Sequence, residues 1–215
     1  MKNSIKISFA LCVTFLLAAA CGKTDANRDY GFPYIYIPQA TVTGLDNSYP
    51  IPVGPLGQNS TYCCKYDEKS GTLDIALGVI RSGYISDAQA FGVKLVTCPE
   101  LTAGKLDEYA SKSTPAIELP AEFYTLPEKI EVAAGKNSGT CYIPVDVQKL
   151  SEEPLYESGK YKLLVLGLQI TDPSAYELAE ENTQVVIVID FNSSYWDDVA
   201  ENLPESEIRN LFPIY

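Results

Sequence analysis

The sequence predicts an all-β fold, an antiparallel sandwich with one internal helix. Three observations support this prediction. Short runs of apolar or alternating residues recur along the chain, turn residues separate them, and one internal segment has the spacing of an amphipathic helix. The runs do not alternate regularly with helices, which argues against an α/β fold. We therefore expect an immunoglobulin-like antiparallel β-sandwich of about seven strands.

The first part of the predicted sandwich has short strands. Residues 34–38 (YIYIP) form a β-rich run that a proline ends, which is typical of an edge strand. Residues 41–60 are rich in glycine, proline and asparagine and are expected to form a loop. A short strand at 61–66 follows, and a turn at 69–71 leads from it into a longer strand at 72–80.

The second part holds the longer strands and the helix. Strands are expected at residues 91–97, 129–133, 140–147, 161–170 and 184–191. The last of these contains the run VVIVIDF, whose continuous apolar character predicts a central strand covered on both faces. Residues 99–110 are expected to form the helix, with Leu101, Leu106 and Tyr109 as its apolar stripe.

The N-terminus has the pattern of an export signal that ends in a lipidation site. Lys2 and Lys6 precede an apolar run at 7–17, which is too short to span a bilayer and suits a signal peptide. Three alanines then lead directly into Cys21. An ordinary secretory peptide with an incidental cysteine is the alternative. We predict that Cys21 carries the lipid and anchors the protein in the outer membrane of a cell envelope.

The prediction divides the chain into four segments. They are a signal peptide at 1–20, a tether at 21–33, the sandwich at 34–191 and a helical tail at 192–215. In the tail, Trp196, Val199, Ala200 and Leu203 recur at the spacing of a helix face.

The amino-acid composition excludes several classes of catalytic and binding site. The chain has no histidine, so Ser-His-Asp and Cys-His catalytic sites cannot form. A net charge of −12 with three arginines argues against nucleic-acid binding. Adjacent acidic pairs at 67–68, 152–153, 180–181 and 197–198 are interpreted as surface charge rather than as a glycosidase pair or a calcium site. We therefore predict no enzyme, no catalytic residue, no metal and no cofactor.

Four cysteines remain beyond Cys12 in the signal and Cys21, namely Cys63, Cys64, Cys98 and Cys141. An exported chain meets an oxidising environment, so disulfides are one interpretation, with three possible pairings. Buried thiols are another, and a metal site has weaker support because the spacing CxxC is missing. The sequence leaves these alternatives open.

Aromatic side chains are the most suggestive candidates for binding, since the chain has 15 tyrosines and one tryptophan. Tyr30, Phe32, Tyr34 and Tyr36 recur at every second residue and would share one face of a strand. Such a face could stack on sugar rings or contact a protein, but we expect it to pack into the sandwich. Tyr195 and Trp196 are the candidate glycan-binding residues, although the helical spacing favours burial of Trp196 against the end of a sheet.

Six segments, taken in order, carry a resemblance to a known family. They are residues 34–40, 77–83, 119–124, 159–161, 176–178 and 186–190. Together they resemble the N-terminal lipoprotein domain of unknown function that is common in Bacteroidota. The resemblance implies an immunoglobulin-like domain on an envelope lipoprotein, often encoded with polysaccharide-utilisation systems and often followed by glycan-binding or glycosidase modules.

Two functions therefore compete. The first is a non-catalytic envelope lipoprotein that binds a polysaccharide or oligosaccharide as an accessory component of a glycan-utilisation system. The alternative is a structural or assembly module that docks a protein partner of an uptake complex through a sheet edge or the C-terminal tail. An exposed aromatic row would favour the first function, and a large exposed apolar patch at the C-terminus would favour the second.

Overall fold

The fold is a two-layer β-sandwich in the part of the chain that the structure describes. The computed structural model describes residues 29–44, 46–52, 63–67, 69–193 and 196. The predicted signal peptide, Cys21, most of the tether and the tail beyond residue 193, Trp196 excepted, lie outside these residues. None of the described helices is long and apolar enough to cross a membrane.

The first sheet has the order β12-β1-β4-β3, and β8 pairs with the other edge of β4. Its strands are β1 (Tyr34–Tyr36), β3 (Cys64–Asp67), β4 (Thr72–Arg81), β8 (Ser138–Asp146) and β12 (Glu177–Leu178). Leu73 and Ile75 of β4 are buried in the core, and so are their antiparallel neighbours on β8, Val145 and Ile143. The long pair of β4 and β8 therefore supplies much of the inward-facing apolar surface of the first sheet.

The second sheet has the order β2-β13-β11-β5-β7, and β6 pairs with β11. Its strands are β2 (Ser48–Ile51), β5 (Phe91–Thr97), β6 (Ala116–Glu118), β7 (Lys129–Val132), β11 (Leu163–Thr171) and β13 (Gln184–Ile189). The shorter elements are β9 (Tyr156–Glu157), β10 (Lys160–Tyr161), α4 (Val147–Leu150) and the 3-10 turns η2 (Pro38–Thr41) and η3 (Ala121–Phe123).

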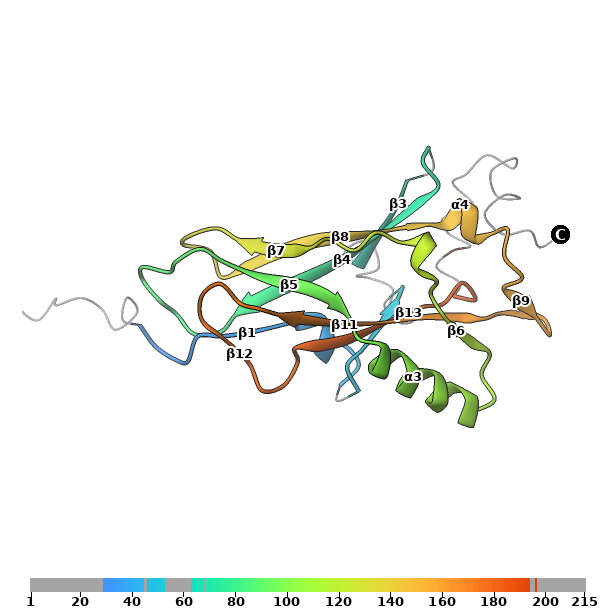
Figure 1. Cartoon of the computed structure of the whole chain (residues 1–215), viewed down its shortest axis with the longest axis horizontal. Helices are drawn as coiled ribbons and strands as arrows, with labels where there is room; N and C mark the ends of the chain where they lie inside the picture. Colours follow the sequence, from blue (N-terminus) through green and yellow to red (C-terminus); the bar gives the residue numbers. More distant parts are fainter. Residues whose placement is uncertain (1–28, 45, 53–62, 68, 194–195, 197–215) are drawn as a thin grey trace, which may run out of the picture.

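The helix α3 (Pro99–Ser111) covers the outer face of the second sheet, as Figure 1 shows. Val165, Val186 and Val188 form a small outer core that Leu101, Leu106 and Tyr109 of the helix pack against. The other face of β13 presents Val185, Ile187 and Ile189 to the core between the sheets. The prediction of a strand covered on both faces is therefore confirmed, and β13 lies between β2 and β11.

Gly167 on β11 lets the first turn of α3 approach the sheet. Its amide donates to Thr102 Oγ1 at 2.9 Å, and its carbonyl accepts from the amide of Cys98 at 2.8 Å. A Cβ atom at this position would lie 2.6 Å from the Cys98 carbonyl oxygen and 2.9 Å from the Thr102 amide nitrogen. Pro99 begins the helix, where the missing amide proton costs no hydrogen bond.

Three details differ from the prediction. Residues 48–51 lie in the segment expected to be a loop, yet they form β2 and pair in parallel with β13. The strand β1 has neighbours on both sides, although its second neighbour, β12, is only two residues long. The sheets are mixed, because β1–β12, β11–β6 and β13–β2 are parallel pairs. The prediction of an all-β sandwich is confirmed, and the parallel pairs are additions to it.

Candidate functional site

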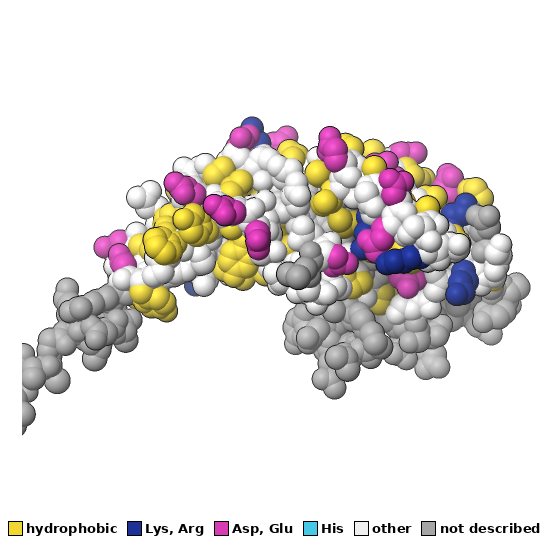
Figure 2. Space-filling model, turned by 90° about the horizontal axis from the view of Figure 1, so that it is seen from below, with side chains coloured by type: hydrophobic (Ala, Val, Ile, Leu, Met, Phe, Trp, Pro, Cys, Tyr) yellow, Lys and Arg dark blue, Asp and Glu magenta, His cyan; other side chains and the backbone are white. Residues whose placement is uncertain are grey.

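Four aromatic side chains are exposed together at the end of the sandwich where β1 begins. We call Tyr30, Phe32, Tyr34 and Tyr84 the aromatic row. Tyr30 is 64% exposed and Phe32 is 74% exposed, and the other two are also open to solvent. Figure 2 shows hydrophobic side chains gathered at the left end of the molecule. Large apolar side chains grouped on a surface mark a site of interaction more often than scattered ones do.

Backbone contacts between two distant segments hold the row. The amide of Tyr30 donates to the Tyr84 carbonyl oxygen at 3.0 Å, and the reverse bond is 2.8 Å long. The two rings stack with their centroids 5.7 Å apart, and the rings of Phe32 and Tyr34 lie 6.1 Å apart. Gly83 permits this close approach, since its φ is +70° and a Cβ there would lie 2.9 Å from the Tyr30 carbonyl oxygen.

The expectation that this face packs into the sandwich is wrong for Tyr30, Phe32 and Tyr34. The inward face of this segment instead carries Ile35 and Ile37, both fully buried. A strand with apolar residues on both faces can bury either one, and here the isoleucines fill the core while the aromatic rings point outward. Tyr84 was missed because a single tyrosine in a loop carries no pattern.

Acidic side chains lie beside the row. Tyr34 is the direct neighbour of the exposed Glu177 in the parallel pair of β1 and β12. Asp29 Oδ1 accepts a hydrogen bond from the Ser86 amide at 2.7 Å. The backbone and side chain of Ser86, and more weakly the charge of Arg81, hold the pKa of Asp29 below its usual value. The candidate site therefore combines flat apolar rings with two acidic side chains, of which Asp29 accepts a hydrogen bond.

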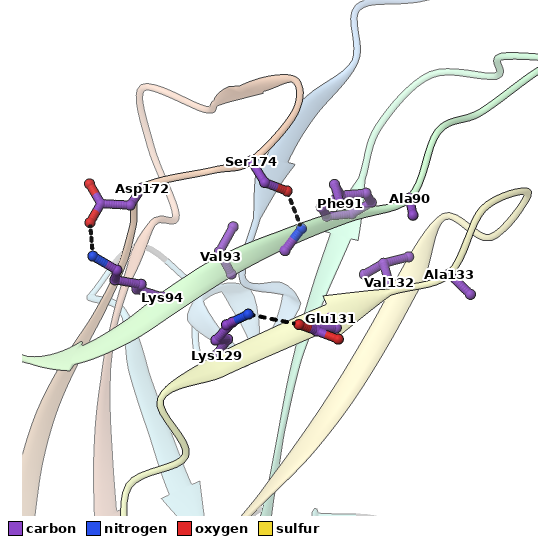
Figure 3. Close-up of a pocket in the computed structure, with 11 residues that line it drawn as sticks. Ala90, Phe91, Val93, Lys94, Lys129, Glu131, Val132, Ala133, Asp172 and Ser174 are labelled. Carbon is purple, nitrogen blue, oxygen red and sulfur yellow. Dashed lines mark hydrogen bonds and ion pairs between the residues drawn. The ribbon is translucent and has the colours of Figure 1, made fainter.

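A second feature is an open hollow of about 580 Å³ on the outer face of β5 and β7 (Figure 3). Its floor includes Gly92, which has no side chain to fill the space between its charged neighbours. The amide of Gly92 donates to Ser174 Oγ at 2.9 Å, and the Ser174 amide donates to the Gly92 carbonyl oxygen at the same distance. These two bonds hold the segment after β11 against the hollow.

Two ion pairs line the hollow. Lys94 Nζ lies 2.7 Å from Asp172 Oδ2, and Lys129 Nζ lies 3.0 Å from Glu131 Oε1. The hydrogen bond and the charge of Asp172 raise the pKa of Lys94. A catalytic lysine needs the opposite shift, so that it loses its proton near neutral pH. The hollow can therefore offer hydrogen bonds to a ligand, and the pKa of Lys94 is shifted away from the range that a general base needs.

Trp196, one of the two predicted glycan-binding residues, is buried and only 5% exposed. Its Nε1 donates to the Asp190 carbonyl oxygen at 2.8 Å, and its ring centroid lies 5.5 Å from that of Phe191. The burial that the helical spacing favoured is confirmed. Tyr195 lies outside the described residues. Glycan binding by this pair stays a prediction, and the burial of the Trp196 ring counts against it because stacking needs an open face.

Cys98 and Cys141 are present as thiols. Cys63, Cys64 and Cys98 are buried, and Cys63 Sγ lies 3.7 Å from Cys64 Sγ. Burial raises the pKa of the Cys141 thiol to about 11. Within the described ranges, no three histidine, cysteine or acidic side chains are grouped so that they could hold a metal ion. Of the alternatives that the sequence leaves open, the structure at Cys98 agrees best with a buried thiol.

The fold and the aromatic row together define a class of protein, a β-sandwich domain with exposed aromatic side chains grouped at one end. Comparison with protein families then narrows the class. A family model for an N-terminal domain matches residues 34–177, which is more than half of the chain. The chain belongs to this family, an N-terminal domain of unknown function found in Bacteroidota.

Comparison with solved structures gives distant similarities. A candidate carbohydrate-binding protein from Bacteroides ovatus has 10% identity and a TM-score of 0.44, with 74% of this chain and 37% of that chain covered. A multidomain protein from Bacteroides ovatus that includes DUF1735 has 17% identity and a TM-score of 0.46, covering 73% and 43%. An auxiliary nutrient-binding protein from Bacteroides thetaiotaomicron has 18% identity and a TM-score of 0.41, covering 69% and 46%.

In each case the match spans less than half of the solved chain. Comparison with curated proteins finds no matching sequence.

Proposed function

We propose that this protein is a non-catalytic envelope lipoprotein that binds a saccharide on the aromatic row, as an accessory component of a glycan-utilisation system. The single observation that carries the proposal is the exposure of four aromatic rings at one end of the sandwich. Keeping apolar side chains exposed costs free energy, roughly 1.5–3 kcal/mol for a large side chain that goes from fully exposed to fully buried, and less for Tyr34 and Tyr84, which are already partly covered. A ligand that covers the rings recovers part of this free energy.

Saccharide chemistry fits such a surface. One face of a sugar ring presents C–H groups that stack on an aromatic ring, while its hydroxyl groups need hydrogen-bond partners at the edge. The row supplies the flat rings, and Glu177 beside Tyr34 and Asp29 near Ser86 supply acceptors. The resemblance to the Bacteroidota family also implies a protein of a polysaccharide-utilisation system. Binding sites on sandwiches also occur more often at their ends and loops than on their faces.

The envelope location rests on the predicted signal peptide and on Cys21. Tyr30 and Phe32 of the aromatic row lie at the end of the predicted tether (21–33), so the lipid and the row would lie at the same end of the protein. Mass spectrometry of the native N-terminus tests this part. We expect a mature chain that starts with lipid-modified Cys21, and release from the membrane or a stalled precursor for Cys21→Ala. An unmodified N-terminus at another residue would remove the lipoprotein assignment.

A glycan array probed with the chain from Gly22 to Tyr215 tests saccharide binding. We expect binding that falls at least tenfold in Phe32→Ala and in Tyr34→Ala. Tyr142→Ala is the matched control, because Tyr142 is 57% exposed on β8 and lies outside the row. Thermal melting checks that each variant stays folded. A wild-type chain that binds no glycan, or row variants that bind as well as the wild type, would contradict the proposal and favour a protein partner.

A further inference from the structure

Tyr176 adopts a backbone conformation that costs energy. Its φ is +66°, in the left-handed region that tyrosine rarely occupies. Such a residue persists only where its surroundings hold it, and it often marks a site that needs an unusual geometry. Tyr176 directly precedes β12, the two-residue strand that brings Glu177 to the aromatic row.

Three contacts hold Tyr176 in this conformation. Its hydroxyl oxygen accepts a hydrogen bond from the amide of Gln89 at 2.8 Å. Its ring meets the ring of Phe91 edge-on, with centroids 5.6 Å apart and an interplanar angle of 87°. The guanidinium carbon of Arg81 lies 5.1 Å from the centre of the same ring. Because Phe91 belongs to the second sheet and Arg81 to the first, these contacts connect both layers.

Arg81 is itself unusual, since it is only 4% exposed. It continues the inward row of Leu73, Ile75, Leu77 and Val79 on β4. Its Nε and Nη1 atoms have no hydrogen-bond partner among the described residues. Buried guanidinium groups are normally paired with acceptors, so this arginine is costly to keep. Its contact with the Tyr176 ring gives it a structural role as the cation that supports that ring.

The result of this arrangement is the position of Glu177. Leu178 packs against the core, and the amide of Ala179 donates to the Ile35 carbonyl oxygen at 2.9 Å, so β12 is fixed in register with β1. Because neighbouring residues of a strand point to opposite faces, Glu177 lies on the outer face with Tyr34. An aromatic ring and a carboxylate are thus held side by side.

We propose that the aromatic row takes a neutral saccharide, that Glu177 accepts hydrogen bonds from its hydroxyl groups, and that Tyr176 and Arg81 are positioning residues for Glu177. This inference rests on the proposed function. The two oxygens of a carboxylate can accept from two neighbouring hydroxyl groups of a sugar that lies on the Tyr34 ring. The same carboxylate, with Asp29 nearby, repels uronate, sulfate and phosphate groups. Binding is therefore insensitive to salt, because the ligand has no charge to screen.

Affinity electrophoresis of the chain from Gly22 to Tyr215 tests this assignment. Gels contain yeast mannan, dextran or arabinoxylan as neutral probes and polygalacturonate as the charged probe. We expect neutral probes to retard the wild type and Tyr34→Ala to abolish the retardation. Glu177→Gln keeps the size of the side chain and removes its charge, and we expect at least a fivefold loss of affinity. Glu180→Gln is the control, an exposed glutamate three residues further on that is expected to have no effect.

The preference for neutral over charged probes shows whether Tyr176 positions Glu177 or only contributes to the stability of the fold. Tyr176→Ala frees Glu177 from its position, so we expect the same loss on neutral probes, together with weaker discrimination against polygalacturonate. A variant that had only lost stability would not change its preference between probes. Tyr176→Phe, which keeps the ring on Arg81 and Phe91, is expected to retain most of the binding.

The outcomes distinguish this inference from the function on which it rests. If Tyr34→Ala abolishes binding while Glu177→Gln has no effect, the role of Glu177 is wrong and the proposed function stands. If no probe, neutral or charged, retards the wild type, or if Tyr34→Ala still binds, both are wrong. If the wild type prefers polygalacturonate and Arg81→Met loses that preference, then Arg81 is an anion site and the neutral assignment is overturned.

Discussion

The rings of Tyr30 and Tyr84 stack with their centroids 5.7 Å apart and their planes 13° apart. This stack joins the first residues that the structure describes to the loop between β4 and β5, which lies more than fifty positions further along the chain. The aromatic row therefore depends on a contact between two distant segments. The residue that permits the contact is Gly83, because a Cβ there would lie 2.9 Å from the Tyr30 carbonyl oxygen.

We expect Gly83→Ala to destabilise this end of the sandwich by about 1–3 kcal/mol, since the new Cβ meets the Tyr30 carbonyl oxygen at a strained positive φ. Gly135→Ala is the matched control, because Gly135 also has a positive φ (+76°) but a Cβ there would have no heavy atom within 4 Å. Urea unfolding of both variants measures the difference. Equal losses would show that the contact with Tyr30 is not tight.

Trp196→Ala is expected to lower the free energy of unfolding by roughly 3–5 kcal/mol, because it removes a buried ring and the donor to the Asp190 carbonyl. Tyr142→Ala, at an exposed position, is expected to change it by less than about 0.5 kcal/mol. Thermal or urea unfolding gives both values. If Trp196→Ala leaves stability unchanged and abolishes glycan binding, the predicted platform of Tyr195 and Trp196 replaces the aromatic row.

Val188→Asp tests the strand that is covered on both faces. Val188 lies under α3, so a carboxylate there is buried without a partner, and we expect a loss of more than about 4 kcal/mol or no folded protein. Val96→Asp on β5 makes the same change at an exposed position and is expected to be tolerated. Circular dichroism and urea unfolding report the result. A stable Val188→Asp variant would contradict the packing of α3 on Val188.

Asp46 forms an ion pair with the buried ammonium group of Lys105. Protonation of Asp46 in acid is therefore expected to lower the free energy of unfolding. Burial alone would raise the pKa of Asp46, but hydrogen bonds from Thr43, Ser48 and Lys105 outweigh it, so the pKa lies well below its usual value. A carboxyl group whose pKa is lower in the folded than in the unfolded chain stabilises the folded protein at pH values above its unfolded-state pKa of about 4. This stabilisation is lost as the pH falls toward the folded-state pKa.

We therefore expect the wild type to exceed Asp46→Asn in unfolding free energy near neutral pH, and the gap to shrink as pH falls below about 4. Urea unfolding across this pH range measures the gap. A gap that stays constant would mean that Asp46 has the same pKa in the folded and unfolded chains.

Local patterns predicted most of the fold. The strand at 91–97 and the helix beginning at Pro99 have the predicted starts, because alternation and helical spacing are properties of neighbouring residues. The strand β2 was missed because its sequence, SYPI, contains a proline and lies in a segment rich in turn residues. What makes it a strand is its pairing with β13, far along the chain, which tolerates Pro50 at the edge of a sheet.

The candidate site was predicted only in part. The alternation of Tyr30, Phe32 and Tyr34 was visible, but a period of two defines two faces without saying which one is buried. Tyr84 joins the row through a backbone bridge, and Glu177 lies beside the row because of the sheet order; neither placement is encoded in the neighbouring residues. The strained Tyr176 and the buried Arg81 are likewise properties of the folded molecule.

Hydroxyl-radical footprinting with and without a bound polysaccharide tests the central claim most directly, because it reports which side chains the ligand covers. With yeast mannan, or whichever probe the chain from Gly22 to Tyr215 binds, we predict protection of Tyr30, Phe32, Tyr34 and Tyr84 from oxidation. Tyr142 and Tyr156, which are also exposed, are predicted to be oxidised equally in both states. Protection of those two residues, with the row left unprotected, would contradict the account.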